Sequence, residues 1–588
     1  LLGFIYLETP TKISNHNDLL NNNSMRKLTL LFCLSVPFLV NAQTPCENGF
    51  AGEYPCDNVD MWSFMSIDEI GGAANLNDIW GWSDIASGRE FALVGKSTGT
   101  AFVEITNPAA PVYLGELATH STNSLWRDIK VIGDYAYIGA EANMHGMQIF
   151  DCTQLLTATD LPVTFEETAH YAGFGKSHNI VVNEETGFAM GVGTSTFDGG
   201  LHIVNVQDPM NPVIAGSFGE DGYTHDAQAV NYHGPDKDYC GAEIVIACNE
   251  DAITIVNITD KEDCQQISTQ GYPESGYTHQ GWMTEDHQFF LSNDELDEIN
   301  GDAEFTKTFI WDIRDLDNPT LLAVHEGVAT SIDHNLYTRW NLVFESNYRS
   351  GLRVLNAARI SSGIMVESAF FDVQPNDDNA SFSGTWSNYC YFPSGVVVVT
   401  DMYSGLFVLQ PYVVSATYNQ TIRNDEDSAV FDVYISYQAE TVEIIATGLP
   451  VGVIASIVSI NNFGATPIAL TGAETLDPGE YVFSISAIVD GVENIFQAKL
   501  NVSEEVAPAI LLVSPLDTDL DNADVTFTWA DNIAESLMLE IATDEDFTDV
   551  VYAEFHEGES VDLPISLPNN TYFWRVFSAD VCGEMTLS

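Results

Sequence analysis

The sequence has very few basic residues. Lysine and arginine together number 19, against 85 aspartates and glutamates, in a chain of 588 residues with a formal net charge of -66 at pH 7. Nucleic-acid binding requires clustered Lys and Arg that neutralise phosphates, so this balance excludes a nucleic-acid partner. The acidic excess fits either of two roles, the binding of cations or the solubility of a secreted surface.

Several motifs of enzymes and cofactor-binding proteins are absent. The sequence has no His-Glu-x-x-His, phosphate-binding loop, Cys-x-x-Cys or haem-attachment motif. No motif therefore assigns a reaction to the protein, and the sequence favours a binding role over an enzymatic one.

Long apolar runs are also scarce. The run at 28–40 follows Met25-Arg26-Lys27 and ends near Ala42, which is the pattern of a secretory signal peptide. No later apolar run reaches the ~18 residues that span a bilayer. We therefore expect upstream, non-structural residues at 1–24, a signal peptide at 25–42, and a secreted protein without a transmembrane segment.

Cysteine is sparse, with nine residues, one of them inside the expected signal peptide. Disulfides persist in the oxidising environment of secreted proteins. Cys46 and Cys56, ten residues apart in a loop with Gly and Pro, are the first expected pair. Cys240 and Cys264, both expected on one face of the same repeat, are the second, and the partners of the other cysteines stay open.

A cassette recurs seven times between residues 77 and 410. Each copy opens on a short polar step and closes on an apolar run. The openings are Asn77-Asp78, Arg127-Asp128, His178-Asn179, His225-Asp226, His279-Gln280, His334-Asn335 and Trp386-Ser387. Successive openings lie 47 to 55 residues apart. Strand-rich repeats of this period are typical of a β-propeller.

Each cassette contains four short strands separated by Gly, Pro and Asp. Pro111, Pro212 and Pro319 each precede an expected fourth strand, where a missing N–H costs no ladder bond. The seventh copy lacks its fourth strand, and the segment 59–67 has no partner before the first copy. We expect this segment to close a seven-bladed propeller spanning 43–411, which would remove exposed sheet edges.

After residue 411 the rhythm of the strands changes. Residues 412–503 resemble an immunoglobulin-like sandwich, and 504–588 resemble a fibronectin type III domain whose last strand is incomplete. The predicted fold is therefore all-β, a seven-bladed propeller followed by two β-sandwiches. A missing C-terminal segment that attaches the protein to the cell surface is a further expectation.

The top of the predicted propeller gathers titratable side chains. Inner strands of four consecutive blades begin at His178, His225, His279 and His334. Second strands end near Glu250, Asp294 and Glu295, at the same end of the channel. Imidazoles among carboxylates are ligands for zinc, manganese or iron, and carboxylates alone suit calcium. The alternative is that the histidines are structural and bond to a neighbouring blade.

The acidic run at 293–298 allows two interpretations as well. It is either a solvated loop or a cation site that brings carboxylates together.

Several segments together resemble the choice-of-anchor B family, whose propeller consists of LVIVD-type repeats. They read CENGFAG at 46–52, YPC at 54–56, NVD at 58–60, THDAQ at 224–228, YTHQGW at 277–282 and NDELDE at 293–298. The resemblance covers about 46–411. It implies an exported propeller with a C-terminal anchoring or sorting segment, and it implies no reaction.

The leading hypothesis is a monomeric, secreted or surface-attached protein that binds an extracellular ligand or a divalent metal at the top of its propeller. One alternative is a metal-dependent hydrolase, in which the four histidines hold the cation and Glu250, Asp294 or Glu295 is the base. The other alternative is a purely structural surface component.

Overall fold

The computed structural model describes residues 43–72, 74–423, 428–457, 459–503, 511–514, 526–530, 537–543, 550–556, 560–562, 572–579 and 585–587. The expected upstream residues 1–24 and the expected signal peptide at 25–42 lie outside this part of the chain. Strands dominate the described residues, and the α-helix among them is the short α1 (Asp297–Asn300). None of their helices is long and apolar enough to cross a membrane.

Seven sheets form the blades of a β-propeller. Blade one contains β4 (Leu76–Asp84), β5 (Arg89–Lys96), β6 (Gly99–Glu104) and β7 (Val112–Ala118). Blade two contains β8 (Arg127–Ile132), β9 (Tyr135–Ala140), β10 (Met147–Asp151) and β12 (Ala169–Tyr171). Blade three contains β13 (Asn179–Asn183), β14 (Phe188–Val192), β15 (Leu201–Asn205) and β16 (Val213–Phe218).

The remaining blades repeat this order. Blade four contains β17 (Asp226–Asn231), β18 (Glu243–Cys248), β19 (Ala252–Asn257) and β20 (Gln265–Gly271). Blade five contains β21 (Thr278–Met283), β22 (Phe289–Asp294), β23 (Lys307–Asp312) and β24 (Thr320–Glu326). Blade six contains β25 (Leu336–Arg339), β26 (Leu342–Ser346), β27 (Leu352–Arg359) and β28 (Ile364–Phe371). Blade seven contains β29 (Thr385–Tyr389), β30 (Val397–Asp401), β31 (Gly405–Pro411) and β3 (Val59–Ser66).

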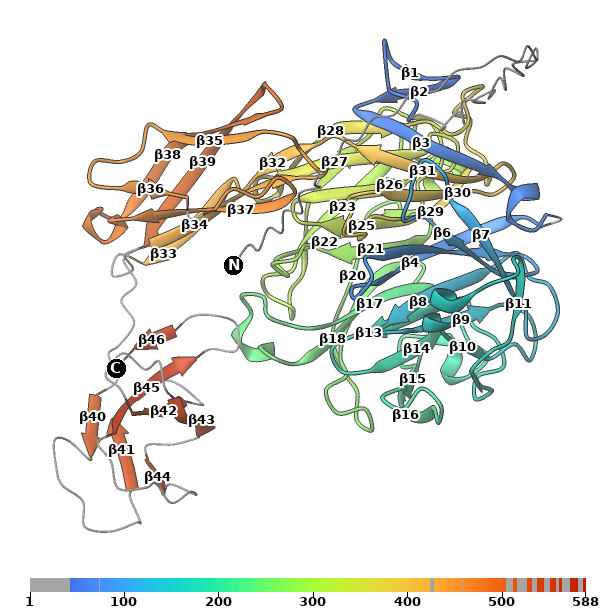
Figure 1. The fold of residues 1–588 in the computed structure, drawn as a ribbon. Coiled ribbons are helices and arrows are strands. Elements are labelled where there is room, and N and C mark those ends of the chain that lie inside the picture. Colours follow the sequence, from blue (N-terminus) through green and yellow to red (C-terminus); the bar gives the residue numbers. More distant parts are fainter. Residues whose placement is uncertain are drawn as a thin grey trace, which may run out of the picture. The chain divides into compact units, whose positions relative to one another are not determined.

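The blades close into a ring. Their inner strands contact one another in the cycle β4, β8, β13, β17, β21, β25, β29 and back to β4. The segment expected to complete blade seven contains β3, which pairs antiparallel with β31 and lies beside it in Figure 1. Strands from both ends of the propeller sequence therefore form one sheet, which removes an exposed edge.

The polar second residue of the openings has a structural role between blades. Asp78 accepts a hydrogen bond from the backbone N–H of Ile129 at 2.9 Å, and Asp128 accepts one from Ile180 at 2.7 Å. Gln280 accepts the equivalent bond from Leu336 at 2.9 Å. Each of these side chains therefore satisfies an inner-strand donor of the next blade, which explains why the position is polar in a buried location.

Two additional pairings extend the blades. The strand β11 (Val163–Phe165) runs parallel to β7 as a fifth strand of blade one. The strands β1 (Phe50–Ala51) and β2 (Tyr54–Asp57) form a hairpin, and β2 pairs with β28 at the outer edge of blade six. Both additions cover outer edges that would otherwise expose unpaired backbone groups.

Two four-stranded sheets follow the propeller. One contains β32 (Val414–Ala416), β34 (Ser428–Ile435), β37 (Gly464–Thr471) and β36 (Ile454–Ser456). The other contains β33 (Asn419–Arg423), β39 (Val492–Ser503), β38 (Gly479–Val489) and β35 (Val442–Thr447). Alternate side chains such as Phe431, Val433, Phe483 and Ile485 pack between them in one core. This is a β-sandwich, in which period-two alternation buries one face of each sheet.

The last part of the chain forms a second pair of sheets. One contains β40 (Leu511–Ser514), β41 (Thr526–Ala530) and β44 (Ser560–Asp562). The other contains β43 (Val550–His556), β42 (Leu537–Ala542), β45 (Phe573–Ala579) and β46 (Met585–Leu587). The fold is therefore all-β, a seven-bladed propeller with two β-sandwiches.

One of the two expected disulfides is present. Cys46 and Cys56 are bonded, with their Cα atoms 6.0 Å apart. The expected Cys240–Cys264 pair is wrong, because Cys264 is a free thiol while Cys240 is itself disulfide-bonded. Cys264 packs with the apolar cluster between blades three and four.

Candidate functional site

The four predicted histidines form a continuous row. Their rings follow one another with centroid separations of 4.2 Å from His178 to His225, 4.4 Å to His279 and 4.3 Å to His334. His279 lies in β21, His178 and His225 directly precede β13 and β17, and His334 lies two residues before β25. These four inner strands lie side by side in Figure 1. The repeat thus places one imidazole per blade at the same height of the ring.

The Nδ1 atoms of this row are engaged with fixed partners. His225 Nδ1 lies 2.8 Å from the carbonyl oxygen of His279, and His334 Nδ1 is bonded to the carbonyl of Trp386. A carbonyl only accepts, so both nitrogens carry the proton. His178 Nδ1 lies 2.8 Å from a carboxylate oxygen of Glu141, and His279 Nδ1 lies 3.3 Å from the amide oxygen of Asn293.

This pattern fixes the tautomer. When Nδ1 of a neutral imidazole is the donor, Nε2 carries a lone pair, which is the arrangement of histidines that bind metals. The bonds of His225 and His334 to the next blade are those expected of structural histidines. They leave Nε2 available, so the structural and the ligating roles are compatible in the same side chain.

Glu295 faces two of these nitrogens. Its carboxylate oxygens lie 3.9 Å from His279 Nε2 and 3.5 Å from His334 Nε2. One ligand atom from each of His279, Glu295 and His334 lies within 4.8 Å of the others. Two imidazoles and one carboxylate are a common ligand set for zinc, manganese and iron, and they leave positions for water or substrate.

The charges of the cluster are set by burial. Burial lowers the pKa of His334 to about 3, and it lowers the pKa values of His225 and His279 well below the usual range, with neighbouring imidazoles contributing. Burial also raises the pKa of Glu295 to about 7. His225, His279 and His334 are therefore neutral at pH 7, the form in which they can donate a lone pair to a metal.

Tyr348 supports Glu295 and was not anticipated from the sequence. Its hydroxyl donates to a carboxylate oxygen of Glu295 at 2.7 Å, and its ring lies 4.7 Å from that of His334. Tyr348 follows β26, at the second-strand end of blade six. Second-strand ends supplied the predicted carboxylates, so the same positional rule could have identified this tyrosine.

The other two predicted acids are not placed as Glu295 is. Asp294 accepts hydrogen bonds from the Tyr272 hydroxyl and from the N–H groups of Gly276 and Tyr277, at 2.6 to 2.8 Å. Asp294 therefore organises the loop at 272–277, which precedes β21. Glu250 is exposed with a positive φ of 64°, and its carbonyl accepts the N–H of Thr278.

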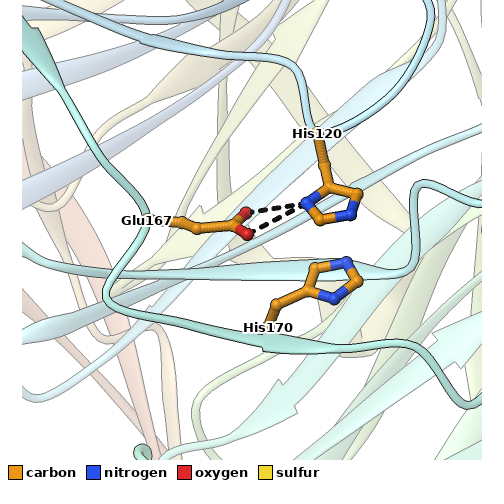
Figure 2. Close-up of side chains that lie close together, drawn as sticks. All are labelled: His120, Glu167 and His170. Atoms are coloured by element: carbon orange, nitrogen blue, oxygen red, sulfur yellow. Dashed lines mark hydrogen bonds and ion pairs between the residues drawn. The ribbon is translucent and has the colours of Figure 1, made fainter.

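A second histidine cluster lies in blade two and is drawn in Figure 2. His120 Nδ1 lies 2.9 Å from Glu167, and the rings of His120 and His170 stack at 3.7 Å with 7° between their planes. His170 Nε2 donates to the His145 carbonyl at 2.7 Å. Lone pairs lie in the ring plane, so stacked rings direct them in parallel rather than at one point. This cluster is a less suitable metal site than the row on the top face.

A Gly-x-Ser-x-Gly pattern occurs at 95–99, but its setting is not that of a nucleophile. It forms the hairpin turn between the antiparallel strands β5 and β6. The nucleophile elbow of hydrolases requires a strand followed by a helix. The pattern therefore carries no catalytic assignment.

The fold and the row of histidines define the class, a β-propeller with a candidate metal site at one end of its channel. An LVIVD repeat matches residues 126–149, which run from just before β8 into β10 and so cover most of the three inner strands of blade two. The sequence matches none of the curated proteins.

Solved structures of similar shape are distant in sequence. A protein from Lactobacillus plantarum is 12% identical and matches 62% of this chain and 92% of its own, with a TM-score of 0.38. A protein of unknown function from Bacteroides thetaiotaomicron is 9% identical and matches 60% of this chain and 94% of its own, with a TM-score of 0.32. The assignment of the fold therefore rests on the sheets described above.

Proposed function

We propose that the protein is an exported binding protein whose propeller presents a transition-metal site on its top face, with His279, His334 and Glu295 as ligands. One observation carries this proposal. A carboxylate faces the Nε2 atoms of two neutral imidazoles, and the Nδ1 atom of His334 is held by a backbone carbonyl. Such outer-shell bonds orient metal-binding histidines in proteins of known structure.

The ligand set selects the kind of metal. Imidazole nitrogen favours zinc, manganese or iron, whereas calcium prefers a shell of oxygen atoms. His225 and His178 extend the row beside this centre and would contact a ligand that spans the top face. The bound metal would supply a Lewis acid to which an extracellular ligand could attach.

Export and surface attachment are part of the same proposal. The apolar segment at 28–40 after basic residues supports a signal peptide, and the Cys46–Cys56 disulfide is consistent with an oxidising compartment. The LVIVD repeat and the segments that resemble the choice-of-anchor B family support a surface propeller of that type.

The test is metal content. Protein purified without chelator should contain about one equivalent of zinc, manganese or iron by elemental analysis. A His279→Ala, His334→Ala double variant should lose that metal and keep the far-ultraviolet circular dichroism spectrum of the wild type. A His120→Ala, His170→Ala double variant is the matched control, because it removes two neighbouring histidines elsewhere and should retain the metal. Metal-free wild-type protein that also fails to take up zinc on titration would refute the proposal and favour a purely structural role.

A metal-dependent hydrolase is the second candidate, favoured by the coordination positions that three protein ligands leave for water. This candidate predicts that metal-loaded protein hydrolyses activated esters or phosphoesters, and that chelation abolishes the reaction. If metal-loaded protein holds the metal stoichiometrically but shows no metal-dependent hydrolysis, the hydrolase is refuted and only the binding function is supported.

A further inference from the structure

Three buried carboxylates gather next to the loop that carries Glu295. Asp297 and Glu298 begin the short helix α1. Asp333 lies three residues before β25, the inner strand of blade six. Their residues are 1%, 7% and 3% exposed, and one oxygen from each lies within 4.8 Å of the others. Full burial of three acids is unusual, because a carboxylate loses several kcal/mol of hydration on burial.

Most oxygens of this cluster have no hydrogen-bond partner among the described residues. Both carboxylate oxygens of Asp297, both of Glu298 and Oδ1 of Asp333 are in this state. Oδ2 of Asp333 accepts the backbone N–H of Lys307 at 3.0 Å. Lys307 Nζ lies near Oδ2 of Asp297, which leaves four oxygens without any partner. Buried polar atoms are almost always paired in native proteins, so these four oxygens in one cluster indicate a missing partner.

The positive charge beside the three acids is insufficient to neutralise three carboxylates. Lys307 Nζ lies 3.3 Å from Oδ2 of Asp297, and this is the ion pair that the structure shows for the three acids. If all three acids are ionised, one ammonium leaves two negative charges uncompensated. A divalent cation would balance this charge and would accept the unpaired oxygens as ligands.

We propose that Asp297, Glu298 and Asp333 bind a divalent cation of the calcium class. Only oxygen ligands are offered, and hard cations such as calcium prefer carboxylate and carbonyl oxygen. The site is separate from the imidazole centre in its donor atoms. The acidic run at 293–298 is compatible in sequence with a solvated loop or a cation site, and the burial of Asp297 and Glu298 favours the cation site.

The cation would also organise the top face. Asp333 is adjacent to His334, and Asp297 lies two residues after Glu295. One cation bound by the three acids would tie the loop after β22 to the start of β25. This consequence rests on the proposed function, whereas the cation site itself does not.

The experiment uses the full chain, stripped with chelator and returned to chelator-free buffer at pH 7.5. Calcium should bind the wild type with about one tight equivalent in calorimetry and raise the thermal midpoint by about 5 °C or more at saturation. Asp333→Asn and Glu298→Gln should each weaken this binding at least 10-fold. Asp302→Asn is the matched control, because it makes the same change at an exposed residue just after α1.

Two outcomes would overturn the site. The first is weak, multi-site calcium binding that Asp333→Asn and Asp302→Asn reduce equally, as expected of a generally acidic surface. The second is a chelator-stripped wild type whose midpoint does not respond to calcium, which would indicate acids that share protons instead of a cation. Calcium binding that persists in the His279→Ala, His334→Ala variant would separate this site from the imidazole centre. Because these calcium measurements on the wild type need no variant, an unstable variant does not compromise the test.

Discussion

Tyr348 is the residue whose loss should weaken the imidazole centre most selectively. Its hydroxyl holds one oxygen of Glu295, and outer-shell partners of this kind typically contribute 10- to 100-fold to metal affinity. We expect Tyr348→Phe to lower zinc affinity about 10-fold, measured by competition with a chromophoric chelator. Tyr403→Phe is the control, because Tyr403 is 57% exposed. Equal affinities in the two variants would contradict the role assigned to Tyr348.

Glu345 is not one of the proposed ligands of either cation, and its burial predicts that the stability of the fold depends on pH. It is 6% exposed, it accepts a hydrogen bond from Asn347 at 3.1 Å, and burial raises its pKa to about 7. Between its ordinary value near 4.5 and pH 7, the folded protein keeps a proton that the unfolded chain releases. Its contribution to the free energy of unfolding is therefore complete below pH 4.5 and is lost as the pH rises through 7.

The expected effect of Glu345→Gln follows from that sign. The amide stays neutral at every pH, so the stability of the variant does not fall with the titration of this group. The free energy of unfolding of the variant, relative to that of the wild type, should therefore rise by roughly 3 kcal/mol from pH 4 to pH 8. Urea unfolding of the propeller at several pH values measures this difference. Parallel stability curves for the two proteins would show that Glu345 titrates normally.

At the scale of elements, the closing strand is the most sensitive part of the ring. Gly405 pairs with Ser66 where β31 meets β3, and a Cβ at this position would clash with the carbonyl oxygen of Met65. The backbone of Gly405 also has a φ of +152°. We expect Gly405→Ala to separate the two strands locally and to cost about 2 kcal/mol or more.

The measurement is the thermal midpoint of the propeller together with amide hydrogen exchange. Protection should fall in β3 and β31 together, although the two strands are far apart in sequence. Gly271→Ala is the control, because this glycine lies at the end of the outer strand β20 and its φ is not positive. Loss of protection in β31 alone would argue against the closure.

Some strands and pairings of the fold could be predicted from the sequence, and others could not. The strands β7, β16 and β24 begin directly after Pro111, Pro212 and Pro319, and the seven repeats correspond to seven sheets. These features follow from local patterns. The pairing of β11 with β7 and of β2 with β28 joins distant segments, and no local pattern records such a pairing.

The site was predictable to the same degree. Equivalent repeat positions located the row of histidines and Glu295. The hydrogen bonds that free Nε2, the support from Tyr348 and the burial of Asp333 depend on contacts between blades. Cys240 and Cys264 failed as a pair because closeness in the sequence does not show which cysteines are bonded to each other.

At the scale of the whole molecule, charge is the dominant feature. With 85 acidic and 19 basic residues, the chain repels itself when folded, and this repulsion weakens as salt shortens the Debye length from about 30 Å at 0.01 M to about 3 Å at 1 M. Raising sodium chloride from 10 to 500 mM should therefore raise the thermal midpoint by several degrees. An uncharged osmolyte at equal osmolarity is the control, because it does not screen charge.

Screening by sodium chloride must be distinguished from calcium binding, since both would stabilise an acidic protein. Screening acts on the whole surface, so it should increase gradually with salt and persist in Asp333→Asn. Stabilisation by calcium at the buried acids should saturate at low calcium concentration, since a single site is filled. In Asp333→Asn, this stabilisation should require at least 10-fold more calcium. A midpoint that rises with calcium and sodium chloride in the same proportion in both proteins would mean that the surface charge alone accounts for the stabilisation. Separate responses would show that the propeller uses its acidic residues in two ways, as a repulsive surface and as buried ligands.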